Sequence, residues 1–450
     1  MGKELGSPIT GCPESPLEQK EKEKQPVKLR VSVFFDGTGN NKYNTDERLA
    51  HSRKYRFTPG VFSGSYENDY SNVARLNECL SDENSEFDFN EKIYIEGIGT
   101  RTKGYDSILG SALGTGSTGI INRNGKLGNG KVKAGLKKLF EDVDGKVNKI
   151  SQNITLLRID VFGFSRGAAA ARTFIHFAMI DAEHKIKTKL QSEGFSVSQV
   201  EVYFSGLFDT VASFGFNHKD DTGELHLDAI SNSVNVLHLV AKNECRKNFP
   251  LTNIKSKGSK EIFLPGVHSD VGGCYTDYME EENLVLMELT NPEIYTAGKS
   301  VSTLQIYELK QANERKLKAE KKRLVNEGWY HELELDISND FQLLANRKNI
   351  RNTYSLLPFA IMKKYAKDNG LKFLIKIEIK YGISNTEKEL NQLMSLITLS
   401  GEGKYEPQQK LMKKIRHDYF HSSSHYNSVG MTPNYKNDDK SLKEREVYDG

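Results

Sequence analysis

The segment at residues 154–174 constrains the fold most, because it reads as a buried strand, a glycine-flanked serine and a helix in direct succession. Residues 154–162 form an apolar run, and the next five residues are Gly163-Phe164-Ser165-Arg166-Gly167. Four alanines follow, which favour a helix. This order is typical of a nucleophile elbow, in which the serine adopts a strained backbone conformation. The segment therefore predicts that Ser165 is a catalytic nucleophile.

Four further strand candidates share the same pattern, an apolar run that ends in polar or glycine residues. They lie at residues 27–35, 91–100, 200–209 and 261–268, and helix candidates at 130–143 and 167–185 lie between strands. Alternating strands and helices predict an α/β fold of the α/β-hydrolase type, with a mostly parallel sheet, helices on both faces, and helical lid insertions. Ligands of such sheets bind beyond the carboxyl ends of the strands. Functional side chains are therefore expected at that edge.

The chain divides into three parts by composition. Residues 1–27 are rich in Lys, Glu and Pro and predict a disordered tail. Residues 28–430 form the expected catalytic domain, with the core motifs in 28–280 and a helical, lid and final-strand region in 281–430. Within that region, 355–362 is the best lid candidate, and packing against the core explains it about as well. Residues 372–380 are a candidate strand, with a helix as the alternative. Residues 431–450 are polar and predict a flexible C-terminal tail.

Composition excludes several classes of function. A net charge of +3 over 450 residues is too small to indicate binding of nucleic acid. The chain has no run of 18 apolar residues, and its N-terminus lacks the apolar segment of a signal peptide. The four cysteines have no zinc-site spacing and are expected to be free thiols. No metal or other cofactor is expected.

A serine nucleophile needs a histidine base and a carboxylate that orients it. The best acid is Asp209, at the end of the strand that follows the elbow. The best base is His268, which also lies at a strand end before a pair of glycines. Asp270 is either an alternative orienting acid or a residue that holds the His268 loop by backbone hydrogen bonds. The alternative bases are in a late polar segment and comprise His417, His421 and His425.

An oxyanion hole needs two hydrogen-bond donors. The backbone N–H of Arg166, directly after the nucleophile, is the first candidate. The second is expected from the glycine-containing loop at residues 36–41, and its candidates are Gly37, Thr38 and Gly39. Glycines in such a loop let the backbone approach a substrate closely.

Four segments together resemble one known family. They are residues 34–41, 163–168, 206–211 and 265–273, in this order along the chain. The set is similar to the α/β-hydrolase domain family that includes the phospholipase effectors of bacterial type VI secretion, of the first lipase-effector subfamily. The resemblance spans residues 28–280, with weaker support to about 430.

The resemblance implies Ser165 as nucleophile, Asp209 as acid and His268 as base. It implies hydrolysis of phospholipid esters at the sn-1 or sn-2 position, as in phospholipases A1 and A2. It also implies a cytoplasmic protein without a signal peptide in the producing cell, delivered to the periplasm of a target cell. The partners implied are a phospholipid membrane surface, a secretion-apparatus spike protein and a cognate immunity protein.

Two other functions remain compatible with the same residues. One is a soluble esterase or thioesterase that uses the same triad on a small acyl ester. The other is a non-catalytic hydrolase fold that serves as an interaction module, against which the intact Ser165, Asp209 and His268 argue.

Overall fold

The computed structural model describes most of the chain from residue 25 to residue 450. The gaps in this description are residues 59, 61–63, 108–109, 112–113, 115–116, 122–125, 148–151, 213–220, 256–258, 297–300, 340, 401–404 and 436–442. The prediction of a disordered tail therefore lies, for residues 1–24, outside the described residues.

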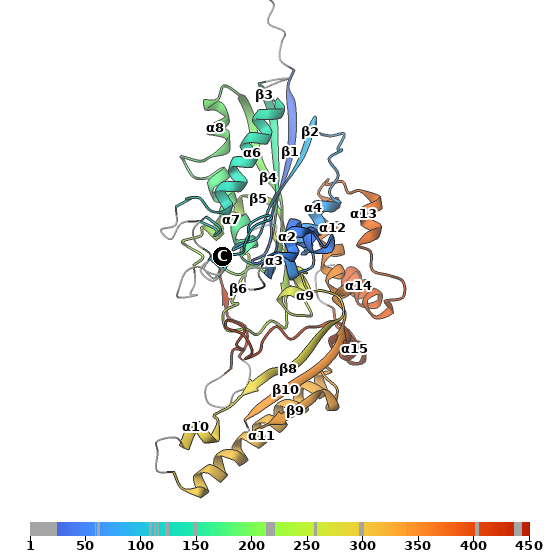
Figure 1. The fold of residues 1–450 in the computed structure, drawn as a ribbon. Helices are drawn as coiled ribbons and strands as arrows, with labels where there is room; N and C mark the ends of the chain where they lie inside the picture. The colour runs from blue at the N-terminus through green and yellow to red at the C-terminus, as the bar shows by residue number, and fades with distance from the viewer. Residues whose placement is uncertain are drawn as a thin grey trace, which may run out of the picture.

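A parallel sheet forms the centre of the molecule (Figure 1). Its strands follow the order β2-β1-β3-β4-β5-β7, and every neighbouring pair is parallel. The strands are β1 (Val27–Phe35), β2 (Phe89–Ile95), β3 (Asn153–Phe164), β4 (Ser196–Phe208), β5 (Ser233–Ala241) and β7 (Ser259–Leu264). All carboxyl ends therefore meet at one edge, which confirms the predicted fold class.

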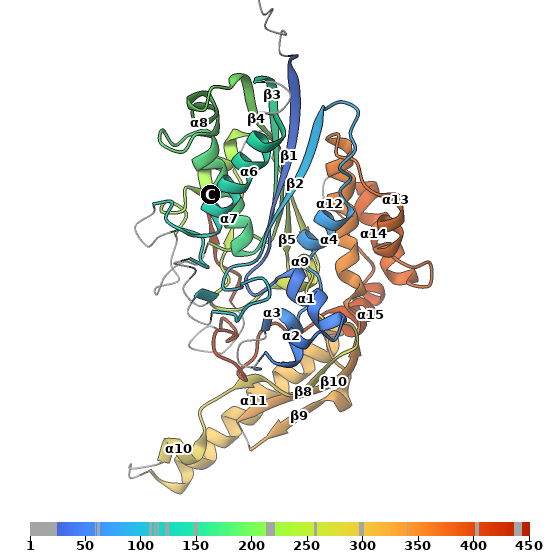
Figure 2. The ribbon, with the colours of Figure 1, turned by 45° about the horizontal axis from the view of Figure 1, so that its top comes forward.

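Helices cover both faces of this sheet (Figure 2). Alternate residues of the strands pack in the two layers. Val33 and Phe35 of β1 pack in the layer formed with α6 (Lys131–Val147), α7 (Arg166–Met179) and α8 (Ile186–Ser192). Phe34 packs in the opposite layer, with α4 (Asn72–Cys79) and α12 (Leu356–Asp368). The period of two along a strand explains why one apolar run supplies both cores.

The remaining helices are short or belong to the C-terminal half. They are α1 (Lys42–Leu49), α2 (Arg53–Arg56), α3 (Gly64–Glu67), α9 (His268–Gly272), α10 (Pro292–Thr296), α11 (Thr303–Glu327), α13 (Ile375–Lys380), α14 (Lys388–Ser400) and α15 (Gln409–Tyr419). Short 3-10 helices occupy Leu227–Asn232, Glu332–Glu334 and Asn352–Ser355. None of the helices in the described part of the chain is long and apolar enough to cross a bilayer.

A second, antiparallel sheet lies beyond the carboxyl edge of the first (Figures 1 and 2). It has the order β8-β10-β9, formed by β8 (Met279–Glu288), β10 (Gln342–Ile350) and β9 (Leu335–Ser338). The long helix α11 packs against β10. The sequence predicted a helical region at 281–430, which contains this helix, but it did not predict the sheet.

Several predictions need correction. β5 was not predicted, although Val236 and Leu239 belong to its buried run, and it separates β4 from β7. The candidate strand at 372–380 ends instead in the helix α13. The lid candidate at 355–362 lies mainly in α12, which buries Leu357 and Met362 against the sheet. An apolar segment that already packs in the core has no free apolar face with which to act as a lid.

The flexible tail predicted for residues 431–450 is wrong for residues 443–450. Strand β11 (Val447–Tyr448) pairs in parallel with β6 (Leu251–Thr252). The N–H of Leu251 donates to Glu446 O at 2.8 Å, and the N–H of Asn253 to Tyr448 O at 3.0 Å. A polar strand with few apolar residues gains its order from this pairing, which a local sequence pattern does not reveal.

Candidate active site

Ser165 lies at a strained turn between β3 and α7, as the sequence predicted. Its backbone has φ 59° and ψ −129°, a conformation that L-residues rarely adopt. Its N–H donates to Phe208 O of the neighbouring strand at 3.0 Å. These contacts fix the serine at the carboxyl edge of the sheet.

Close packing explains the two glycines that flank the serine at a distance of two residues. A Cβ on Gly163 would lie 2.5 Å from Ala168 Cα, and one on Gly167 would lie 2.2 Å from Asp36 O. Neither glycine has a positive φ, so the requirement is space rather than backbone freedom. The elbow thus lies directly against the loop that follows β1.

Asp209 and His268 meet at the same edge. Asp209 follows β4 and has a φ of 42°, and its Oδ2 lies 2.5 Å from His268 Nδ1. His268 begins α9, and its backbone N–H donates to Glu244 Oε2 at 3.2 Å. Its side chain lies between the rings of Phe164 and Phe249, with centroid distances of 4.7 Å and 5.0 Å. The structure therefore brings together the acid and the base predicted from sequence.

Charges around this pair set its protonation. Burial alone would raise the pKa of Asp209, but the cation of Arg445 and the bond to His268 hold that pKa far below its usual range. Burial lowers the pKa of His268 against the opposing effect of Asp209. The pair is thus an ionised carboxylate beside a neutral imidazole whose Nδ1–H donates to it, which leaves Nε2 able to accept a proton. Among the described residues no hydrogen bond joins Ser165 Oγ to this Nε2, a contact that substrate-free enzymes often hold long.

A second ion pair, between Glu244 and Arg246, contacts the backbone of the candidate base His268. Glu244 accepts from the guanidinium of Arg246 at 2.9 Å and 3.0 Å as well as from the His268 N–H. Burial would raise the pKa of Glu244, but Arg246 lowers it to about 2. Arg246 in turn lies over the ring of Phe249, 3.3 Å from its centroid. No sequence motif marks Glu244, Arg246 or Phe249, because their role depends on contacts with α9 and His268.

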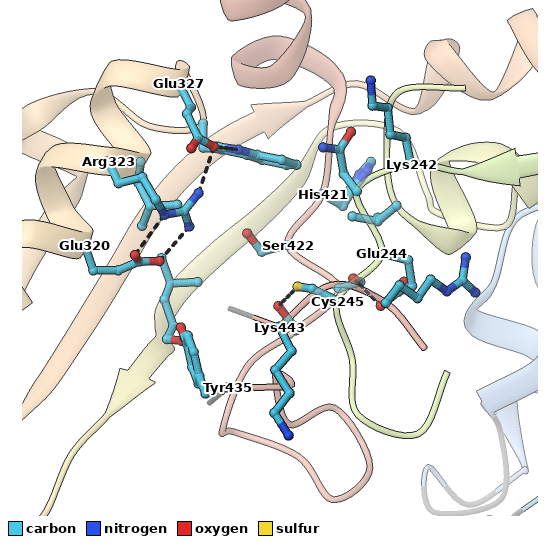
Figure 3. A pocket seen from close by; sticks show the side chains of 18 of the residues that line it. Lys242, Glu244, Cys245, Glu320, Arg323, Glu327, His421, Ser422, Tyr435 and Lys443 are labelled. Carbon is cyan, nitrogen blue, oxygen red and sulfur yellow. Dashed lines mark hydrogen bonds and ion pairs between the residues drawn. The ribbon is translucent and has the colours of Figure 1, made fainter. Parts of the chain in front are cut away.

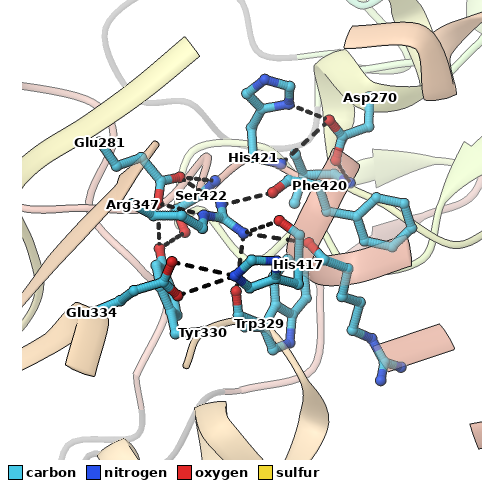
Figure 4. A network of polar contacts seen from close by, with 12 residues as sticks. Asp270, Glu281, Trp329, Tyr330, Glu334, Arg347, His417, Phe420, His421 and Ser422 are labelled. Carbon is cyan, nitrogen blue, oxygen red and sulfur yellow. Dashed lines mark hydrogen bonds and ion pairs between the residues drawn. The ribbon is translucent and has the colours of Figure 1, made fainter. Parts of the chain in front are cut away.

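The alternative base histidines have other partners (Figure 4). His421 Nδ1 lies 2.8 Å from Asp270 Oδ1, and its ring stacks on Tyr275. His417 contacts Glu334 and Asp418. Neither contacts Asp209, and the described contacts of His425 include a backbone bond to Met431 but none to Asp209.

Asp270 contacts both His421 and the turn that leads into His268. Its Oδ2 accepts from the N–H of Val267 at 3.0 Å, so it holds the turn that leads into His268. Of the two roles considered for Asp270 in the sequence, the geometry matches the one in which it holds this loop by backbone hydrogen bonds.

The loop after β1 contacts the elbow as predicted for an oxyanion hole, but it uses two of its three candidate donors elsewhere. The N–H of Gly37 donates to Asp36 Oδ1 at 2.7 Å, and the N–H of Gly39 donates to Ile98 O at 3.0 Å. Within the described part of the chain, the N–H of Thr38 has no such partner. Arg166 donates from Nε to Thr38 Oγ1 at 2.9 Å, so the side chain of the elbow arginine ties the loop in place.

Asp36 stabilises this loop by accepting several hydrogen bonds. It is buried and accepts from Ser71 Oγ and Tyr94 Oη, both at 2.5 Å, in addition to the N–H of Gly37. Burial raises the pKa of Asp36 against these hydrogen bonds. No group of three or more His, Cys, Asp or Glu side chains in the described ranges has the arrangement of a metal site.

Comparison with known protein families gives one match. Residues 178–291 match the family model described as "T6SS, Phospholipase effector Tle1-like, catalytic domain". That range contains Asp209 and His268 and begins after Ser165. Among curated proteins, none matches the chain.

Two solved structures match the chain. The Tle1 effector bound to the VgrG spike from the type VI secretion system is 20% identical, with a TM-score of 0.61 and coverage of 95% of both chains. An uncharacterized protein from Pseudomonas aeruginosa is 19% identical with a TM-score of 0.43, over 86% of this chain and 52% of that one. The match of residues 178–291 to this family model agrees with the resemblance drawn from the four motifs, and the chain shares its fold with the Tle1 effector.

Proposed function

We propose that the chain is a phospholipase A whose catalytic triad is Ser165, Asp209 and His268. The observation that carries this proposal is the contact of 2.5 Å between Asp209 Oδ2 and His268 Nδ1 at the sheet edge where the strained elbow holds Ser165. The same three residue types act together in serine hydrolases of unrelated folds.

In the proposed reaction, Ser165 Oγ attacks the carbonyl carbon of an acyl ester while His268 Nε2 takes the hydroxyl proton. Asp209 stabilises the imidazolium that forms. The oxyanion accepts hydrogen bonds from the N–H of Arg166 and the N–H of Thr38. His268 then returns the proton to the leaving oxygen of the lysophospholipid, and water releases the fatty acid from the serine by the same steps in reverse.

We further propose partners and a place of action. The solved Tle1 effector is bound to a VgrG spike, which supports a spike protein as the carrier of this chain as well. We propose that the enzyme then acts at the phospholipid surface of the target-cell periplasm, and that an immunity protein protects the producing cell. Because phospholipids are barely soluble as monomers, the proposed hydrolysis takes place at a membrane surface.

The test compares phospholipid vesicles with a short soluble ester. We expect the wild type to release fatty acid from vesicles and Ser165→Ala to lose at least ~10³-fold in kcat. Activity on the soluble ester alone would make the chain a soluble esterase instead. No activity on either substrate, with the wild type folded, would contradict a catalytic role. Lipids with different chains at sn-1 and sn-2, read by mass spectrometry, distinguish the A1 from the A2 reaction.

The base is tested by a matched pair of histidines. His268 and His421 are both buried and both bonded through Nδ1 to an aspartate. We expect His268→Ala to lose activity as Ser165→Ala does, and His421→Ala to keep most of its kcat. The reverse result would move the base to His421 and Asp270.

A further inference from the structure

The C-terminal segment at residues 443–450 reaches the acid of the proposed triad. It enters through a backbone bond from the N–H of Lys443 to Asn434 O at 2.7 Å, and β11 then pairs with β6. The N–H of Thr252 in β6 donates to Thr210 O at 3.0 Å, directly after Asp209. The segment is therefore attached to the strand end that bears the acid.

Arg445 in this segment binds Asp209 through a two-pronged contact. Its Nη1 lies 2.7 Å from Asp209 Oδ1, and its Nη2 lies 2.9 Å from Oδ2. Its Nε donates to Phe249 O at 2.7 Å. The N–H of Ala241 also donates to Asp209 Oδ1, at 2.9 Å. The planar guanidinium thus fixes both oxygens of the carboxylate, which a single charge at one point does not achieve.

We propose that Arg445 is a positioning residue for the triad, which holds Asp209 in the orientation that binds His268 Nδ1. The proposal rests on the proposed function, since it assigns Asp209 and His268 their catalytic roles. It makes the last eight residues of the chain part of the active-site support. Arg445 lies 236 positions after Asp209 in the sequence.

Arg445 acts on the triad through its forked geometry and through its positive charge, and substitutions can separate the two effects. The forked geometry orients the carboxylate. The positive charge offsets part of the negative charge of Asp209, so it weakens the stabilisation of protonated His268. The other charged groups around His268 are Glu244 and Arg246 after β5 and Asp270 in α9. Removal of the Arg445 charge therefore raises the pKa of His268, whereas a lysine in its place keeps the charge and loses the fork.

A cavity lies beside Arg445, which is one of its lining residues (Figure 3). It measures about 360 Å³, and Arg445 lines it together with Val267, Lys443 and residues of α11. A small cation can therefore reach the place that Arg445→Ala leaves empty. This makes the proposal open to chemical rescue.

The experiment measures the rate at which an alkyl fluorophosphonate labels Ser165, as a function of pH. We expect Arg445→Ala to label about 100-fold more slowly than the wild type, since a displacement near 1 Å costs that much, and its acid limb to move to higher pH. Arg445→Lys should also label slowly, but the acid limb of its pH profile should lie at the same pH as that of the wild type. Millimolar guanidinium chloride should speed Arg445→Ala, whereas equal sodium chloride should not. Glu444→Gln, an exposed neighbour, is the matched control and should label at the wild-type rate.

Three outcomes would overturn the proposal. The first is labelling of Arg445→Ala at the wild-type rate, and the second is an equal loss of labelling rate in Glu444→Gln. The third is a loss of labelling rate in both Arg445 variants that guanidinium does not restore, together with a fall in their melting temperature. Labelling needs no phospholipid, so its result stands apart from the vesicle assay. If the wild type labels rapidly but hydrolyses no lipid, the proposed substrate is contradicted. The role of Arg445 can still be tested by labelling in that case.

Discussion

Phe164 and His268 lie ring against ring, with centroids 4.7 Å apart and planes inclined by 34°. Phe164 directly precedes the elbow serine, so this contact joins the strand of the proposed nucleophile to the helix of the proposed base. The contact exists only because Gly272 of α9 leaves room for the phenylalanine ring. A Cβ at that position would lie 2.0 Å from Phe164 Cε2.

Gly272→Ala should therefore lower both activity and stability. The added methyl group forces Phe164 away from its place beside His268, and overpacking of this kind costs about 1–3 kcal/mol. The measurements are the free energy of unfolding in urea and kcat on vesicles. A variant with wild-type kcat would show that the Phe164–His268 contact has no influence on the base.

Gly145→Ala is the control for that change. Gly145 lies in α6, and nothing lies within 4 Å of the Cβ that the substitution adds. We expect an increase of about 0.4–1 kcal/mol in the free energy of unfolding and no change in kcat, because alanine restricts the unfolded chain more than glycine does.

The pH dependence of kcat/KM should show an acid limb below about 6.5, the ordinary pKa of histidine. Burial lowers the pKa of His268, so its neutral form, which is the base, persists to a lower pH than that of an exposed histidine. Asp418 raises the pKa of His417, and His417→Gln should leave the limb in place. A limb above 6.5 would contradict the burial of the base.

The loop after β1 should depend on Asp36. Asp36→Asn weakens the acceptor that holds Ser71, Tyr94 and the N–H of Gly37, and so loosens the backbone that bears Thr38. We expect kcat to fall with little change in KM, by less than the ~10²–10³-fold that loss of an oxyanion donor costs. Glu141→Gln on the exposed side of α6 is the control. A change in KM alone would place Asp36 outside the oxyanion site.

The central sheet contains a buried ion pair that should be sensitive to removal of one partner. Arg30 of β1 contacts Asp160 of β3 at 2.7 Å and 3.0 Å, and both side chains are fully buried. Arg30→Met or Asp160→Leu alone should cost about 3–5 kcal/mol of unfolding free energy, because each leaves one buried charge unpaired. The double variant should cost less than the sum of the two, as measured in a thermodynamic cycle. Additive losses would show that the two charges are not coupled.

Much of the first half of the molecule follows from local patterns. The bounds of β1 agree with the predicted strand, and the turn at Ser165 has the predicted strand and helix on either side. The period of two in a strand and the space needed around an elbow are properties of a few consecutive residues. A short segment is therefore sufficient to predict them. The same reasoning predicted the acid and the base as strand-end residues.

The sequence by itself determined a parallel α/β sheet, a serine elbow, and polar residues gathered at one edge. Only the tertiary structure decided that His268 rather than His421 contacts Asp209, a contact across 59 positions. It also decided that β5 lies between β4 and β7, and that Arg445 of the C-terminal segment binds Asp209. The physical reason is that strand pairing and buried ion pairs join residues distant in sequence, and their energy depends on burial that no local pattern reports.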